Sequence, residues 1–276
     1  LCSGSNEGLH AAFVAWGKQG KVVLPGLTYT AHVPYAEQKG VEMIRIPLKD
    51  DLSIDLDGMA AAVTDDVSLV YLCNPNNPTG HTLDGELLRD FCRTVGKSAV
   101  VLIDEAYNEL TDRPDYTSMV DLVREGENVI VMRTFSKIFG MAGLRVGYGI
   151  ARPDLTATVA SHVMAWPNGV GMAAAQACYT DDEFISFSRS KIFEGREMVM
   201  KTFRDNGFEP LPSQTNFVFA NIGRSGPAFQ EQMAERGILI RGSWPGQPNS
   251  IRVSMGRLED IEVFQTVFTD LVSGRG

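Results

Sequence analysis

TFSKIFGMAGLRVGYG, residues 134–149, follows directly on residues 128–133, an apolar run with the length of a buried strand. The stretch places Ser136 beside Lys137 and puts Arg145 eight residues further on. Glycine lets the backbone approach a bound ligand closely. Such glycines stand here at Gly140, Gly143 and Gly147. The stretch therefore indicates a strand that ends in a ligand-binding loop.

Two other apolar runs upstream also end in polar motifs. Residues 68–73 lead into CNPNNPTG at 73–80, and residues 99–103 lead into DEAY at 104–107. In an open α/β sheet, ligands bind beyond the carboxyl ends of parallel strands, so we expect the three clusters to form one site. The side chains expected there are Asn77, Asp104, Tyr107, Thr134, Ser136 and Lys137.

Helical and strand patterns alternate along most of the chain, which predicts an α/β fold with a largely parallel sheet. Strands are expected at 21–24, 43–48, 68–73, 99–103, 128–133 and 145–151, and helices at 6–16, 56–63 and 84–95. A long helix over 180–206 precedes a different pattern. That pattern has strands at 216–221 and 250–254 and helices at 227–236 and 260–271. We expect a large domain at 1–185 and a smaller C-terminal α+β domain at 186–276.

Composition excludes several classes of protein. Hydrophobic residues make up 44% and charged residues 21%, which is ordinary for a soluble globular chain. The net charge is −9 without a cluster of Lys or Arg, so we expect no nucleic-acid partner. No apolar run reaches the roughly 18 residues that span a bilayer, so we expect no membrane contact. We expect a cytoplasmic protein.

Other motifs of catalysis are missing from the sequence. Its four histidines lack metal-ligand spacing, so no metal is expected. The four cysteines form no disulfide framework, and Cys73 and Cys92 are expected to be buried apolar residues. The chain contains no phosphate-binding GxxxxGK[ST] loop, no dinucleotide fingerprint and no GxSxG elbow.

Each polar cluster also has a plain structural explanation when it is taken alone. A lysine after a strand is usually solvated, and an aspartate there often caps a helix or turn. CNPNNPTG has the composition of a turn. Arg145 could be a surface cation or the ion-pair partner of Asp104 or Glu105. The order and spacing of all three clusters carry more information than any one of them.

In that order, CNPNNPTG, IDEAY and TFSKIFGMAGLRVGYG resemble the fold-type I enzymes that depend on pyridoxal 5′-phosphate (PLP), in the class I/II aminotransferase group. Within that group the chain looks most like the histidinol-phosphate aminotransferase subfamily, from about Ser3 to the C-terminus. The resemblance implies the PLP-dependent transferase fold and a homodimer. It also implies ping-pong transfer of an amino group between an L-amino acid or histidinol phosphate and a 2-oxo acid.

The resemblance further implies a role for each residue around the PLP ring. Lys137 would hold the cofactor as a Schiff base and then move a proton from the substrate Cα. Asp104 would keep the pyridine nitrogen protonated. Tyr107 and Asn77 would hydrogen-bond the phenolic oxygen, and Tyr29 would stack on the ring.

Phosphate and substrate contacts follow from the same resemblance. The cofactor phosphate would bind at Gly4, Ser5 and Asn6, before a helix, and at Thr134, Ser136 and Arg145. Arg252 would grip the substrate carboxylate, with Asn77 beside it. Arg241 is a candidate for binding a second anionic group of the substrate. Trp244 is either a wall of the substrate pocket or part of a surface turn.

Two alternatives stay open on sequence alone. One is another PLP reaction on the same fold, such as a decarboxylase or a racemase. The other is the PLP-sensing domain of a transcription regulator. The chain starts at Leu1 within motif-like sequence, so we expect a preceding N-terminal segment, which could be an arm, an export signal or a further domain.

Overall fold

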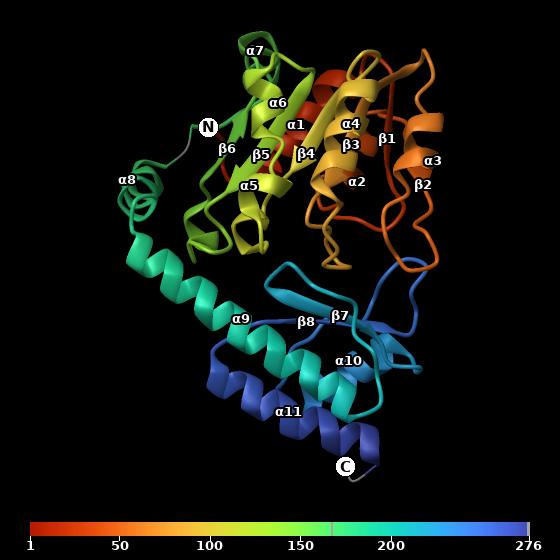
Figure 1. Cartoon of the computed structure of the whole chain (residues 1–276), viewed down its shortest axis with the longest axis vertical. Coiled ribbons are helices and arrows are strands. Elements are labelled where there is room, and N and C mark those ends of the chain that lie inside the picture. Colours follow the sequence, from red (N-terminus) through yellow and green to blue (C-terminus); the bar gives the residue numbers. More distant parts are fainter. Residues whose placement is uncertain (167, 275–276) are drawn as a thin grey trace. The chain divides into compact units, whose positions relative to one another are not determined.

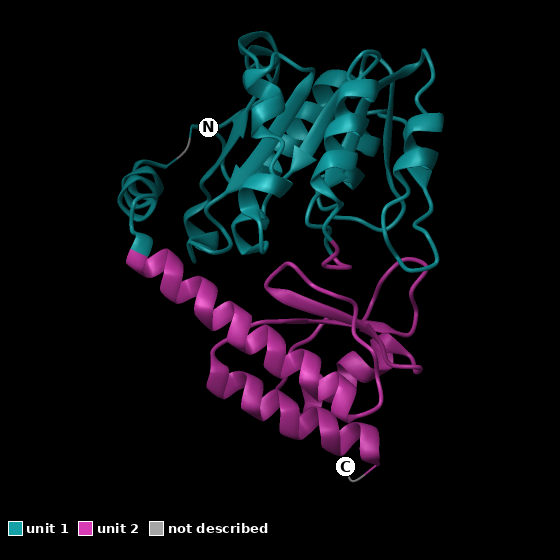
Figure 2. Cartoon of the chain, viewed as in Figure 1, with its two compact units in different colours: residues 1–77, 82–182 teal, residues 78–81, 183–276 magenta. Residues whose placement is uncertain are grey.

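A computed structural model describes residues 1–166 and 168–274. Contacts within the chain divide it into two compact units (Figure 2). The first comprises residues 1–77 and 82–182, and the second comprises residues 78–81 and 183–276. The main division thus falls close to the expected one after residue 185. The assignment of residues 1–185 to a large PLP-binding domain and of residues 186–276 to a small C-terminal domain stays a prediction.

The first unit is built on a six-stranded sheet with the order β2-β1-β3-β4-β5-β6 (Figure 1). The strands are β1 (Lys21–Pro25), β2 (Met43–Ile46), β3 (Val67–Cys73), β4 (Val100–Asp104), β5 (Val129–Thr134) and β6 (Gly147–Ile150). Neighbours from β2 to β5 pair in parallel, and β6 runs antiparallel to β5 at the edge. The predicted α/β class with a mostly parallel sheet is confirmed.

Helices cover both faces of this sheet. One face packs against α1 (Ser5–Gly17), α2 (Val33–Gln38) and α7 (Pro153–Ala160). The other packs against α3 (Leu56–Ala61), α4 (Gly85–Val95) and α6 (Val120–Arg124). Side chains of a strand alternate between faces, so Leu102 of β4 joins the first layer while Val101 and Ile103 join the second. Strands covered on both sides explain the continuous apolar runs of the sequence.

Helix α4 shows how local sequence forms these elements. The Asp84 side chain accepts hydrogen bonds from the Glu86 and Leu87 N–H groups at 3.0 and 3.1 Å, which caps the helix. Its buried face includes Leu88 and Cys92. The expected burial of Cys92 is confirmed, and Cys73 on β3 is also fully buried.

Several short helices of the first unit were not predicted. They are α2, α6 and α7, together with η1 (Asn108–Leu110), α5 (Pro114–Thr117), η2 (Ala142–Leu144) and α8 (Gly169–Cys178). Most are too short to display a helical period. The sequence of α8, GVGMAAAQAC, lacks a contrast between an apolar and a charged face.

The second unit has the α+β composition that the sequence predicts. It holds an antiparallel pair, β7 (Phe217–Asn221) and β8 (Ser250–Ser254), with α9 (Asp182–Asp205), α10 (Gly226–Glu235) and α11 (Leu258–Ser273). Its core contains Phe203, Phe264 and Phe268, with ring centres 5.1 Å apart for Phe203 and Phe268. Across the described part of the chain, no helix is both long and apolar enough to cross a membrane.

Candidate active site

One pocket of the first unit lies where β4 and β5 end and α1 begins. Its lining residues are Ser5, Asn6, Tyr29, Asp104, Ala106, Tyr107, Thr134, Ser136, Lys137, Ala142 and Arg145. All except Ala106 and Ala142 are site residues expected from the sequence. The structure thus brings together residues as far apart in the chain as Ser5 and Arg145.

Gly4 and Asn77 lie beside this pocket. Asn77 Nδ2 donates a hydrogen bond of 3.3 Å to the Tyr107 hydroxyl. Gly4 has a φ of 78°, and a Cβ atom there would clash with the Arg145 guanidinium. The positive φ favours glycine at position 4, and a larger residue there would also displace the flexible Arg145 guanidinium from its place beside the helix start.

Asp104 is a carboxyl group buried at the end of β4, with 2% of its surface exposed. Its Oδ1 accepts a hydrogen bond of 3.2 Å from the Ala106 N–H, and the Cys73 thiol lies 3.9 Å from Oδ2. Burial raises the pKa of Asp104 to about 7, although the positive charge of Lys137 opposes the rise. A cationic partner in the pocket would stabilise the ionised form.

Lys137 follows β5 in a short turn. The Ser136 N–H donates to Thr134 Oγ1 at 3.1 Å, and the Gly140 N–H donates to the Lys137 carbonyl at 2.9 Å. These bonds fix the backbone on both sides of the lysine. Its Nζ lies 5.0 Å from the centre of the Tyr107 ring, so the amine and the phenol share one part of the pocket.

The pocket also contains groups that are suited to an anion. Helix α1 begins at Ser5 without a side-chain cap, and the free N–H groups of a helix start attract negative charge. The Thr134 hydroxyl donates to Ser136 Oγ at 2.8 Å, and Arg145 Nη1 donates to the same oxygen at 3.4 Å. Tyr29 borders this region, since its hydroxyl donates to Asn6 Oδ1 at 3.3 Å.

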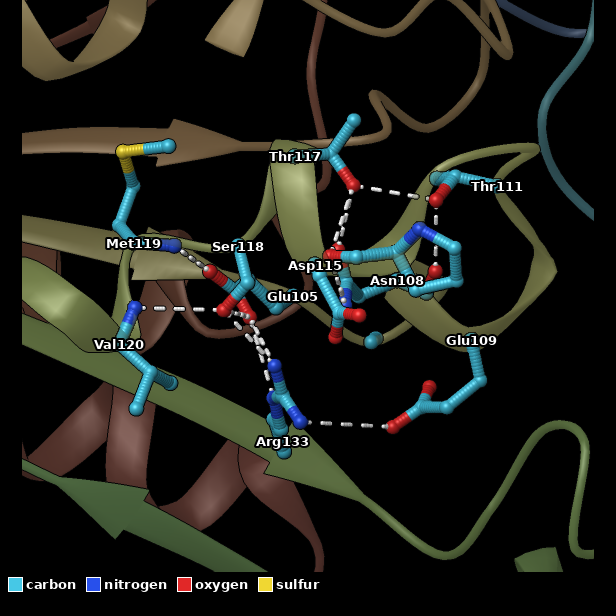
Figure 3. Close-up of polar contacts among 12 residues, drawn as sticks. Glu105, Asn108, Glu109, Thr111, Asp115, Thr117, Ser118, Met119, Val120 and Arg133 are labelled. Carbon is cyan, nitrogen blue, oxygen red and sulfur yellow. Dashed lines mark hydrogen bonds and ion pairs between the residues drawn. The ribbon is translucent and has the colours of Figure 1, made fainter.

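Arg145 is not the ion-pair partner of Asp104 or Glu105 that the sequence left open. Its guanidinium donates to the carbonyls of Ala142 and Ser3, at 2.8 and 3.2 Å. Glu105 pairs with Arg133 instead (Figure 3).

Arg241 and Arg252 belong to the second unit, where they are backbone neighbours. The Arg241 N–H donates to the Arg252 carbonyl at 3.1 Å, and the Arg252 N–H donates back at 2.7 Å. The Trp244 ring lies 4.4 Å from the Arg241 guanidinium and 5.3 Å from that of Arg252. Two cationic groups therefore flank one indole ring.

Residues 1–267 match the model of the family described as aminotransferase class I and II. The chain belongs to this family. It is 33% identical over 275 residues to histidinol-phosphate aminotransferase of Brevibacillus brevis, covering 99% of this chain and 75% of that protein. It is 38% identical over 226 residues to an aromatic amino acid aminotransferase of Mycobacteroides abscessus, covering 82% and 64% of the two chains.

A solved structure of the same kind contains the cofactor. Histidinol-phosphate aminotransferase of Sinorhizobium meliloti in complex with PLP has a TM-score of 0.85 and 28% identity, covering 98% of this chain and 76% of that one. Membership makes this chain a PLP-dependent aminotransferase of fold type I, acting on small molecules. The decarboxylase, racemase and regulator alternatives receive no support from these relatives.

The pocket suits PLP chemically. An uncapped helix start with Arg145 matches a phosphate, and a buried carboxylate such as Asp104 matches a protonated ring nitrogen. Lys137 supplies an amine within the same pocket.

Sequence reasoning missed two parts of the surroundings. One is the Cys73 thiol beside Asp104. The other is the Glu105–Arg133 ion pair. The alternation of side chains along β4 and β5 could have found the pair. Glu105 follows the pocket residue Asp104, and Arg133 precedes the pocket residue Thr134, so both are expected to face the other side of the sheet.

Proposed function

We propose that this aminotransferase moves an amino group between histidinol phosphate, or an L-amino acid, and a 2-oxo acid in ping-pong order, at the pocket around Lys137. The gathering of nine expected side chains in one pocket carries the proposal for the site. The similarity to a histidinol-phosphate aminotransferase along 99% of the chain supports this substrate class.

We assign the contacts of PLP as follows. The start of α1 at Ser5 and Asn6, with Gly4 before it, would hold the phosphate together with Thr134, Ser136 and Arg145. Asp104 would hold the ring nitrogen, and Tyr107 and Asn77 the phenolic oxygen. Tyr29 would cover one face of the ring. When bound, PLP supplies an electron-withdrawing ring that makes the Cα–H bond of the substrate acidic.

Lys137 is proposed to act twice. It would attach the cofactor covalently, and its neutral amine would then take the proton from the substrate Cα. The Tyr107 hydroxyl, held by Asn77 Nδ2 at 3.3 Å, would keep a fixed donor beside that amine. Asp104 would remain a carboxylate, because a protonated ring nitrogen opposes the effect of burial on its pKa.

The substrate anion is proposed to bind at Arg252. Histidinol phosphate carries a phosphate in place of the α-carboxylate of an amino acid, so the two half-reactions present different anions to the enzyme. Arg241, which flanks the same Trp244 ring, would supply a second cation for the phosphate, which carries more charge than the carboxylate.

We also propose a homodimer in the cytoplasm that binds no nucleic acid or membrane. Support for the dimer comes from large apolar side chains that are exposed in and just before α8. Met164 and Trp166 are each 94% exposed and Val170 is 75% exposed. Exposed apolar patches commonly mark association surfaces.

The substrate assignment is tested by supplying the PLP-loaded protein with one amino donor at a time. Histidinol phosphate, L-glutamate and L-phenylalanine are each mixed with a 2-oxo acid, and the products are identified by mass spectrometry. Amino transfer from histidinol phosphate supports the proposal. Transfer from phenylalanine alone would move the chain to the aromatic donors, and no transfer from any donor would overturn the proposed site.

A further inference from the structure

Glu105 and Arg133 form an ion pair that the chemistry above does not use. The Glu105 side chain is fully buried, and that of Arg133 is 18% exposed. Arg133 Nε and Nη2 both donate to Glu105 Oε2, at 3.0 and 2.8 Å (Figure 3). A planar guanidinium is suited to this paired contact, which an ammonium group cannot reproduce.

The pair lies on the opposite face of the sheet from the pocket. Asp104 and Thr134 line the pocket, and Glu105 and Arg133 are their immediate neighbours in the chain. Side chains of consecutive strand residues point to opposite faces, and Glu105 directly follows Asp104, the last residue of β4. The Glu105 N–H also donates to the Met132 carbonyl at 2.8 Å, so the backbones of β4 and β5 stay paired at this level.

Glu105 also holds the segment that follows β4. The Met119 N–H donates to Oε1 at 2.6 Å, and the Ser118 hydroxyl donates to Oε2 at 3.0 Å. Arg133 Nη2 donates to Ser118 Oγ at 2.9 Å. One buried carboxylate thus connects β5 with the far end of the loop that begins at Tyr107.

The interior of that loop is hydrogen-bonded as well. Asn108 Oδ1 accepts from Thr117 Oγ1 at 2.8 Å, and Thr111 Oγ1 lies 3.0 Å from Thr117 Oγ1 (Figure 3). The Leu110 N–H donates to the Tyr107 carbonyl at 2.9 Å. A displacement at Ser118 and Met119 would therefore reach Tyr107 through a continuous set of bonds.

Charge makes the same pair costly to break. Burial raises the pKa of Glu105, and the Arg133 charge and the Met119 N–H oppose the rise. The Glu105 charge also raises the pKa of Asp104, next to it in the chain. Removing Arg133 would leave a buried carboxyl group without its main counter-charge, one residue from the pocket.

We propose that Arg133 is a positioning residue of the aminotransferase, acting through Glu105 to hold Tyr107 and Asp104 at the distance from Thr134 and Lys137 that PLP binding requires. The inference rests on the proposed function, because it takes this pocket as the PLP site. It assigns a role to side chains that never touch the cofactor.

Three variants test the proposal. Arg133→Met removes the contact with Glu105, Arg133→Lys keeps the charge without the paired contact, and Glu105→Gln combined with Arg133→Met removes both charges. Met59→Ala is the control, because Met59 is a fully buried residue on α3 in the same core layer, with no bond to the pair. We expect it to lower the melting temperature by leaving a cavity in the core, without changing a residue of the loop.

The first measurement is hydrogen exchange of the cofactor-free protein. For Arg133→Met we expect exchange at the Met119, Leu110 and Thr111 amides to rise about tenfold or more. Met59→Ala should leave hydrogen exchange at those amides near the wild-type rate, even where its melting temperature falls as much as that of Arg133→Met. If the Leu110 and Thr111 amides of Arg133→Met exchange at the wild-type rate, the proposal is overturned, whether or not the protein binds PLP.

The second measurement is PLP affinity by equilibrium dialysis. We expect affinity to fall about tenfold or more in Arg133→Met, and less in Arg133→Lys. The double variant should regain melting temperature and keep the weak affinity, because the link to β5 is still missing. Recovery of wild-type affinity in the double variant would contradict positioning. Failure of the wild-type protein to bind PLP would instead contradict the proposed function.

Discussion

Asp104 combines deep burial with a position beside a cation. Its carboxyl group has 2% exposure, and its pKa of about 7 lies well above the ordinary value of 3.8 because of burial. The native state without cofactor therefore binds a proton that the unfolded chain releases at lower pH. Stability falls as pH rises from about 4 to about 7 and is then constant with respect to this group.

This linkage predicts the behaviour of Asp104→Asn in the cofactor-free protein. Asparagine carries no charge to bury, so its free energy of unfolding should not fall over this range. The difference in the free energy of unfolding between variant and wild type should therefore grow by about 2 kcal/mol from pH 5 to pH 8. Urea unfolding at the two pH values measures the difference. The same variant should bind PLP more weakly, because the ring nitrogen loses its carboxylate. If the difference in the free energy of unfolding between the variant and wild type is the same at both pH values, the pKa of Asp104 is not raised by burial.

Helix α1 and strand β6 meet at Gly147, and their contact fixes the anion-binding part of the pocket. The Gly147 N–H donates to the Cys2 carbonyl at 3.0 Å. A Cβ atom on Gly147 would clash with the Ser5 nitrogen and the Gly4 carbonyl carbon, which are backbone atoms that cannot rotate away. The first turn of α1 would have to shift.

We therefore expect Gly147→Ala to cost about 1–3 kcal/mol of stability and to weaken binding of PLP and of inorganic phosphate. Gly149→Ala on the same strand is the matched control, since its Cβ would meet the flexible Met132 side chain at 3.0 Å. Denaturant unfolding and dialysis check both variants. If the two substitutions change stability and ligand binding equally, the close approach of α1 to β6 does not determine the geometry of the anion site.

The sequence predicted the elements that are long or lie beside motifs. Continuous apolar runs identified β3, β4 and β5, and helical spacing identified α4 and α9. The turn around Tyr107 was not predictable, because its two helices, η1 and α5, are too short to show a helical period. The bond that closes the turn joins Ser118 to Glu105, which lie 13 positions apart in the chain. For the same reason Arg133 drew no attention, since its partner lies 28 positions away in the chain.

At the scale of the whole molecule, motif order was more informative than any single residue. The predicted α/β class, the parallel sheet and the family are all borne out. The proposed dimer surface had no comparable signal in the sequence, because α8 and the residues before it match no motif. Their exposed side chains became visible only in the folded chain, with Trp166 at 94% exposure.

If this surface joins two subunits, Trp166→Glu should weaken dimerisation. Burying a charge in place of a large aromatic side chain should raise the dimer dissociation constant about 30-fold or more. Sedimentation at several protein concentrations measures it. Leu87→Glu, on α4 and 64% exposed, is the control and should leave the constant unchanged. A wild-type protein that stays monomeric at all concentrations would refute the dimer.

The most direct test of the central claim follows an isotope from donor to product. The PLP-loaded protein and its Lys137→Ala variant are mixed with nitrogen-15-labelled L-glutamate and an unlabelled 2-oxo acid, and mass spectrometry follows the label. We expect the wild type to deliver the label to the 2-oxo acid and the variant to lose about a thousandfold or more in rate, with its fold intact by circular dichroism. Transfer by Lys137→Ala within tenfold of wild type would contradict the assignment of Lys137 and of the pocket built around it.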